Sequence, residues 1–433
     1  MNKISTKKET QELAITIYNG GFGAVKEKRR IDLEQGDTHL LYGDVAQLIE
    51  TDSLIVEGIN VVEFNYDFDL VNKEKLLMKY IDKEVFIRSR ETGERKSCRL
   101  LSVDVTGRCV LEDNNSKEIY LDSQDEIILP TLPSGLIVSP ALVWKILGNS
   151  ESEVSVSYLS KGFNWKANYV VELKETFLNV IGWAEINNQS GMTYENAKVK
   201  LIAGDVNRVN EEMGLMEVRH FKMDSTLGGQ AQEKTFFDYH MYTLNNLTTI
   251  KDNQTKQVNI LSGENIPYNQ YYKLDLYDDS AEIMVEFENE VESGLGIPMP
   301  KGRIKLYKED VADNSLEFIG EDEIDHTPKG ETITLSIGKA FDVTFEYDEI
   351  DRKKIKGFEH FKYRCKVSNH KMEAIKVHFE PNIWGSWEMV SSTHEFNKKS
   401  SRKLEYIIDI EADGEEVIEF EYKIDMRTEL IIK

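Results

Sequence analysis

The 433-residue sequence has few cysteines and no long apolar run. The sequence has three cysteines, an odd number, and they lack the spacing of metal ligands: Cys98, Cys109 and Cys365. This disfavours a disulfide framework and a cysteine zinc site. No stretch of about 18 apolar residues occurs, so we expect no membrane insertion. The N-terminal segment is charged and lacks the apolar region of a secretory signal, which predicts a reduced, cytoplasmic protein.

Positive charge is also scarce. The sequence has 53 basic and 77 acidic residues, which gives a formal net charge of −24. An electrostatic field of this sign repels phosphate backbones and anionic lipid surfaces. We therefore expect no nucleic-acid partner, and solubility alone accounts for the acidic excess.

Familiar catalytic and cofactor motifs are missing. The eight histidines include no His-Glu-x-x-His pair, and no Gly-x-Ser-x-Gly nucleophile motif occurs. Gly20-Gly21-Phe22-Gly23 imitates a kinase phosphate loop, but no other kinase motif follows it. This glycine cluster instead favours a hairpin turn. We expect no cofactor and no metal ion.

Period-two alternation of apolar and polar residues is abundant. Val154, Val156 and Tyr158 alternate with serines, and Leu404 to Ile410 and Val417 to Ile424 show the same period. The one convincing helical pattern covers Asn72 to Ile81, where Leu76, Leu77 and Tyr80 share a face. The pattern predicts an all-β fold with one short helix.

The chain length favours two to four domains. Turn signals and composition predict an N-terminal β-strand region at 1–66 and a helix-plus-barrel insert at 67–133. The five short strands of the insert suggest a small closed barrel resembling an SH3 or Sm fold. A central β-sandwich region at 134–345 and a C-terminal immunoglobulin-like sandwich at 346–433 complete the prediction.

The central stretch carries a distinctive set of residues: Tyr158, Gly162, Trp165, Ala167, Tyr169, Gly182, Trp183, Asn188, Gly191, Tyr194, Asn196, Ala197, Ala203, Gly204 and Asp205. This set resembles the signature of the domain-of-unknown-function 4139 family, whose longer members include mucoidy-inhibitor-A-like proteins. The likeness extends to segments beginning at Asn65, Gly296, Phe318 and Gly338. The resemblance implies no established reaction, and it points toward the cell envelope or exopolysaccharide.

One segment gathers carboxylates beside an imidazole. Glu321, Asp325 and His326 are candidates for a divalent-cation site or an acid–base pair. The structural alternative is a hairpin, because strand spacing turns alternate carboxylates to one side and Thr-Pro-Lys-Gly at 327–330 has turn chemistry.

Tryptophans offer a second candidate. Trp384 and Trp387 flank a Gly-Ser turn and could bind a carbohydrate through their rings. Tryptophans of β proteins more often belong to the core, and we predict core positions for Trp165 and Trp183.

The leading functional hypothesis is a non-enzymatic β-sandwich interaction or scaffold protein whose partner is another protein. Two alternatives stay open. One is a metal-dependent hydrolase that uses the acidic hairpin at Asp325 and His326. The other is an envelope or exopolysaccharide-related carbohydrate binder that uses Trp384 and Trp387.

Overall fold

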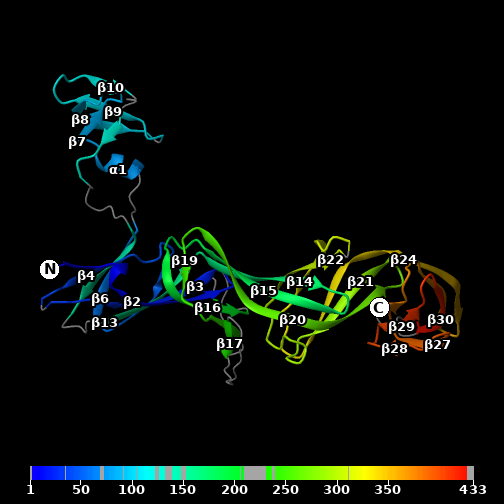
Figure 1. The fold of residues 1–433 in the computed structure, drawn as a ribbon. Coiled ribbons are helices and arrows are strands. Elements are labelled where there is room, and N and C mark those ends of the chain that lie inside the picture. Colours follow the sequence, from blue (N-terminus) through cyan, green and yellow to red (C-terminus); the bar gives the residue numbers. More distant parts are fainter. Residues whose placement is uncertain are drawn as a thin grey trace. The chain divides into compact units, whose positions relative to one another are not determined.

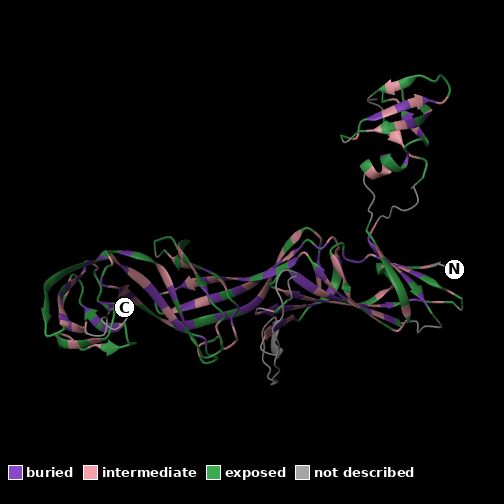
Figure 2. Ribbon diagram, turned by 180° about the vertical axis from the view of Figure 1, so that it is seen from behind, coloured by how far each residue is buried: buried purple, intermediate pink, exposed green. Residues whose placement is uncertain are grey.

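β-Strands dominate the computed structural model (Figure 1). Within the described residues, thirty strands accompany one α-helix and one 3-10 helix, so the predicted all-β fold is confirmed. Buried and less buried residues alternate along many strands (Figure 2), because successive strand side chains point to opposite faces. No helix in this part of the chain is long and apolar enough to cross a membrane. The structure describes residues 2–34, 36–68, 73–90, 92–104, 106–121, 126–131, 139–147, 153–204, 206–208, 231–236, 239–310 and 312–426.

The chain divides into two compact units. The first comprises residues 1–164, 187–201 and 246–255, and the second comprises residues 165–186, 202–245 and 256–433. Each unit joins segments that are distant in the sequence. The predicted division into four consecutive domains stays a prediction, and Asp205 of the family signature lies outside the described residues.

Besides the small sheet described below, the first unit contains two sheets. The elements in and beside these two sheets are β1 (Asn2–Ser5), η1 (Lys7–Glu9), β2 (Thr10–Tyr18), β3 (Phe22–Arg30), β4 (His39–Gly43), β5 (Ile49–Glu57), β6 (Val61–Asp67), β12 (Ala141–Ile146), β13 (Glu153–Lys161), β16 (Tyr194–Ala203) and β19 (Thr248–Ile250). One sheet has the order β1-β4-β12-β6, with β1 parallel to β4. The other contains the order β16-β2-β3-β13-β5, with β19 beside β16.

The glycine cluster lies in the turn between β2 and β3. These strands are antiparallel neighbours, and Gly21 has a φ of +84°. A residue with a Cβ atom rarely adopts this conformation, which explains the glycine. The predicted hairpin turn is confirmed.

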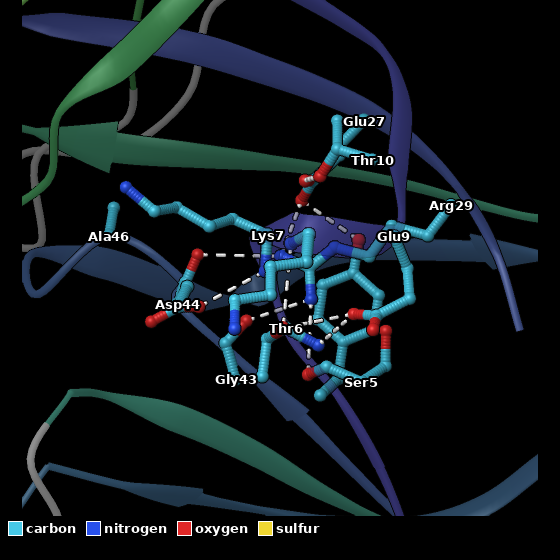
Figure 3. Close-up of polar contacts among 12 residues, drawn as sticks. Ser5, Thr6, Lys7, Glu9, Thr10, Glu27, Arg29, Gly43, Asp44 and Ala46 are labelled. Atoms are coloured by element: carbon cyan, nitrogen blue, oxygen red, sulfur yellow. Dashed lines mark hydrogen bonds and ion pairs between the residues drawn. The ribbon is translucent and has the colours of Figure 1, made fainter.

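The first unit also buries an ion pair (Figure 3). The Arg29 guanidinium lies 2.9 Å from a Glu27 carboxylate oxygen, and their side chains are 0% and 2% exposed. The guanidinium also donates to the backbone carbonyl oxygens of Ser5 at 3.3 Å and Gly43 at 2.9 Å. Tyr42 donates its hydroxyl hydrogen to Glu27 at 2.9 Å. These contacts tie β3 to β1 and β4, because a buried charge is stable only when it is paired and hydrogen-bonded.

A small antiparallel sheet has a core of its own. Its elements are α1 (Lys73–Lys79), β7 (Glu84–Arg88), β8 (Arg95–Val103), β9 (Cys109–Asp113), β10 (Ile119–Leu121) and β11 (Glu126–Ile128). The order is β10-β9-β8-β7-β11. The helix and five strands agree with the predicted insert, and Leu77, Tyr80, Val85 and Leu100 are among the residues of the core.

The closed barrel predicted for this segment is not found. Strands β10 and β11 are the two ends of an open order, and no pairing between them occurs in the described residues. Each has only three residues, so a closing ladder would gain few hydrogen bonds. The predicted exit at Pro133 lies outside the described residues.

The second unit contains one long sheet, the strands packed on its C-terminal part, and the antiparallel pair of β17 and β18. Its strands are β14 (Phe163–Leu173), β15 (Phe177–Asn188), β17 (Ala231–Phe236), β18 (Tyr239–Leu244), β20 (Gln254–Leu274), β21 (Ser280–Glu288), β22 (Gly302–Glu309), β23 (Leu316–Ile324), β24 (Thr332–Ile355), β25 (Phe358–Asn369), β26 (Ile375–Phe379), β27 (Trp387–Ser392), β28 (Asn397–Lys398), β29 (Leu404–Ile410) and β30 (Glu415–Asp425). The main order is β23-β22-β14-β15-β20-β21-β24-β25-β30-β27, while β26 pairs with β20 and β29, and β28 pairs with β29.

The C-terminal strands share an apolar core. Phe379 of β26, Tyr406 of β29 and Phe420 of β30 are all buried in it, and their rings lie 5.8–6.2 Å apart. Along β30, Ile418, Phe420 and Tyr422 are buried and the residues between them are not. The alternation predicted for this segment is confirmed.

The two central tryptophans have different environments. Trp165 is 3% exposed, and its indole nitrogen donates to the Ile202 carbonyl oxygen at 2.9 Å. Trp183 is only half-buried, because Gly182 and Ala184 on either side of it occupy the inward positions of β15. The core assignment is confirmed for Trp165 and wrong for Trp183.

We expect Trp165→Ala to lower the free energy of unfolding by about 3–5 kcal/mol, since it opens a cavity and removes the hydrogen bond to the Ile202 carbonyl. Trp183→Ala, the matched control, should cost less than half as much. Urea unfolding followed by far-ultraviolet circular dichroism measures both values. Equal losses in the two variants would contradict these assignments.

Candidate functional site

The acidic hairpin predicted from the sequence lies on the surface of the second unit. Glu321 belongs to β23 and lies 4.0 Å from Arg303, and its side chain is 48% exposed. The Asp325 side chain is 87% exposed and lies 3.1 Å from the Lys301 ammonium group. The backbone N–H of Lys301 donates to His326 Nδ1 at 3.1 Å. Ion pairs with basic neighbours account for these carboxylates, and the chemical interpretation of the hairpin stays a prediction.

A different histidine and two other carboxylates lie close together. Possible ligand atoms of His378, Glu380 and Glu405 all lie within 4.8 Å of one another. Strands β26 and β29 form an antiparallel pair, which brings His378 and Glu405 together across 26 intervening positions. The two glutamate side chains are only 8% and 7% exposed. Sequence reasoning missed this group, because its members have no recognisable ligand spacing.

Two lysines neutralise these carboxylates. Lys399 Nζ lies 3.0 Å from Glu380 and 2.5 Å from Glu405. Lys403 Nζ lies 2.5 Å from the second Glu380 oxygen. One imidazole and two carboxylates are donors that a divalent metal ion accepts. The ammonium groups already supply the positive charge here, so the residues present fit an ion-pair cluster better than a metal centre.

The pKa shifts agree with an ion-pair cluster. Burial raises the pKa of Glu380, but hydrogen bonds and charge from Lys403 and Lys399 outweigh burial and lower it overall. Burial lowers the pKa of Lys399, and its contacts with Glu405 and Glu380 reverse that effect and raise it. Burial also lowers the pKa of His378. These shifts favour a charged Glu380 carboxylate, a charged Lys399 and a neutral His378 imidazole.

The cluster anchors a loop that carries four basic residues. Lys398 ends β28, and Lys399, Arg402 and Lys403 follow before β29 begins. The loop lies against the turn at 382–387: the Ile383 N–H donates to the Arg402 carbonyl oxygen at 2.8 Å. Strands β27 and β28 border these two segments (Figure 1).

The loop and the turn form a surface of two rings and two cations. Arg402 Cζ lies 5.4 Å from the ring centroid of Trp384, and Lys398 Nζ lies 4.4 Å from that of Trp387. Trp384 is 71% exposed, whereas Trp387 is half-buried and donates its indole N–H to the Ser401 carbonyl oxygen at 2.8 Å. We call Trp384, Trp387, Lys398 and Arg402 the aromatic–cationic surface. The structure thus brings together the two tryptophans proposed from the sequence and adds two cations.

A hollow of about 710 Å³ lies on the small sheet of the first unit. Arg95 lies over the Phe86 ring at 3.8 Å, and Lys96 lies over the Tyr120 ring at 6.0 Å. Three carboxylates line the same hollow: Glu94, Asp113 and Glu118. Its mixed charge distinguishes the hollow from the aromatic–cationic surface.

We expect Lys399→Met to lower the free energy of unfolding by about 1–3 kcal/mol at pH 7, because a buried carboxylate loses its charged partner. The folded-state pKa of Glu380 lies below its ordinary value of 4.5. The stabilisation from charged Glu380 is therefore complete above that value and is lost as the pH falls through the lower folded-state pKa. The difference between wild type and variant should shrink accordingly in acid.

Chemical denaturation at several pH values measures this difference. Lys376→Met is the matched control, because Lys376 is exposed on β26 and the same charge is removed without uncovering a buried carboxylate. A loss of stability that is equal in both variants would contradict the ion-pair cluster.

For the acidic hairpin, Asp325→Asn and His326→Gln should each change stability by no more than about 1 kcal/mol, since both side chains are exposed. Melting curves with calcium, magnesium, manganese or zinc should show no shift in wild type. A metal-dependent rise in melting temperature that both variants abolish would instead support the metalloenzyme alternative. A metal ion present at a hundred times its dissociation constant would increase the free energy of unfolding by about 2.7 kcal/mol.

Comparison with known proteins finds no matching family model and no matching curated protein.

Proposed function

We propose that this chain is a non-enzymatic interaction or scaffold protein that binds its partner through the aromatic–cationic surface. The exposure of Trp384 is the observation that carries the proposal. Large exposed aromatic rings are typical of binding surfaces, where they remove much apolar area from water on contact. A partner that covers Trp384 would bury this apolar area, and the ring would need little rearrangement because it is already exposed.

The positions of the other charged groups support binding over catalysis. Asp325 and the His326 ring are engaged with Lys301, and Glu380 and Glu405 are engaged with Lys399. Catalytic acids and bases need a reacting group within hydrogen-bond reach. These carboxylates are instead committed to neighbouring lysines.

Another protein is the partner expected from the sequence, and a carbohydrate is the second candidate. The carbohydrate is favoured by the place of Trp384 beside Gly385, whose φ of +86° turns the chain between the two tryptophans. Such a turn presents a ring at the surface, outside the C-terminal core.

Finer assignments belong to the same proposal. We propose an immunoglobulin-like sandwich for residues 346–433, supported by the core that β25, β26, β29 and β30 share. For the small sheet we propose kinship with SH3-like modules, supported by its five short antiparallel strands. A cytoplasmic location and membership of the domain-of-unknown-function 4139 family are proposals that rest on the sequence.

Affinity capture from extracts of the source cells tests the proposed function. We expect the full-length wild-type chain to retain a partner that Trp384→Ala loses. An exposed side chain contributes little to folding, so the variant should keep its stability within about 0.5 kcal/mol. Asp325→Asn combined with His326→Gln is the control and should retain the partner. The proposal would be refuted if the Asp325→Asn and His326→Gln double variant lost the partner while Trp384→Ala retained it.

A further inference from the structure

We propose that the aromatic–cationic surface binds an acidic polysaccharide, with a sugar ring against Trp384 and sugar carboxylates paired with Arg402 and Lys398. The inference rests on the proposed binding function and specifies the ligand class.

The four basic residues of the loop fall into two pairs. Lys399 and Lys403 bond to the buried carboxylates of Glu380 and Glu405. Lys398 and Arg402 have exposed side chains, and no carboxylate among the described residues lies within ion-pair distance of either one. Within the described residues neither cation is neutralised by a carboxylate, although the chain carries a net charge of −24. They are available to an anion from outside.

Both available cations lie over tryptophan rings. A cation near the face of an indole ring is attracted by the ring quadrupole. This attraction restricts the cation before a ligand arrives, and restriction before binding lowers the entropy cost of association. Arg402 adds a planar guanidinium, which matches the two oxygens of a carboxylate. The surface therefore combines a carboxylate-binding group with an apolar ring at a separation of 5.4 Å.

A polysaccharide fits this combination better than an acidic peptide does. Peptides commonly add a strand to a free sheet edge and use their backbone groups to bind. Between the turn and the loop the backbone is already engaged, because the Ile383 N–H donates to Arg402, the Leu404 N–H donates to Pro381, and Asn382 forms a bridge with Lys403. Strand β27 is the last strand of the sheet order, but Trp384 and Arg402 lie outside it. At these two residues the groups left for a ligand are a ring face and a cationic side chain. A uronic-acid polymer presents both complements, since its sugar rings carry polarised C–H groups and its carboxylates carry the charge.

Native gel electrophoresis in gels that contain polygalacturonate tests the inference with the full-length chain. We expect polygalacturonate to retard wild type and dextran, which is uncharged, to leave its mobility unchanged. Trp384→Ala and Arg402→Gln should each raise the dissociation constant at least about tenfold, a change that corresponds to about 1.4 kcal/mol. Matched controls are Phe341→Ala, which removes a ring that is 94% exposed, and Lys329→Gln, which removes an exposed cation. Both should bind as wild type does.

Polyglutamate in the same gels distinguishes the ligand classes. Weak or no retardation by polyglutamate supports the polysaccharide. Equal retardation by both polymers would overturn it in favour of acidic peptides. The inference also fails if polygalacturonate does not retard wild type, or if the control variants lose binding as much as Trp384→Ala does. If polygalacturonate is not bound while Trp384→Ala still abolishes capture from extracts, the binding function stands and only the ligand class is wrong.

Discussion

A buried carboxylate needs a cation or hydrogen bonds as partners, and this constraint positions the loop between β28 and β29 in the second unit. Glu380 and Glu405 are almost completely buried, so each would be strongly destabilising without a partner. Lys399 and Lys403 meet that need and thereby fix the loop between β28 and β29. With its anchor residues turned inward, the loop holds Lys398 and Arg402 over the tryptophan rings of the neighbouring turn.

The same constraint acts in the first unit. Arg29 and Glu27 are buried together, and Arg29 also holds the backbone carbonyls of Ser5 and Gly43. The pair joins β3 to β1 and β4, which belong to a different sheet. In both units a cluster of ionisable residues could be mistaken for a catalytic site. Each cluster instead has a structural role, because its charges neutralise one another and position the backbone. Groups that are open to a ligand lie outside these clusters, on the surface.

The sequence predicted much of the local structure. Alternation gave the correct inward residues along β29 and β30, and the glycine cluster gave the hairpin between β2 and β3. The aromatic character of Trp165 and Trp183 predicted core positions for both. The prediction is correct for Trp165 and wrong for Trp183, because Gly182 and Ala184 occupy the inward positions of β15. Barrel closure was predicted from the number of short strands, but closure depends on pairing between the end strands, which the sequence does not encode locally.

Strand content, turn positions and the outward or inward direction of many side chains were determined by the sequence itself, because they depend on residues one to four positions apart. The tryptophan pair was also visible there, since Trp384 and Trp387 flank one turn. Only the tertiary structure decided which charges are available. The pairing of β26 with β29 and the path of the loop before β29 bring together His378, Glu380, Glu405 and Lys399. Lys399 neutralises buried carboxylates, whereas the adjacent Lys398 lies over an indole ring, and no linear pattern distinguishes these two lysines. The physical reason is that burial and pairing of charge depend on neighbours in space.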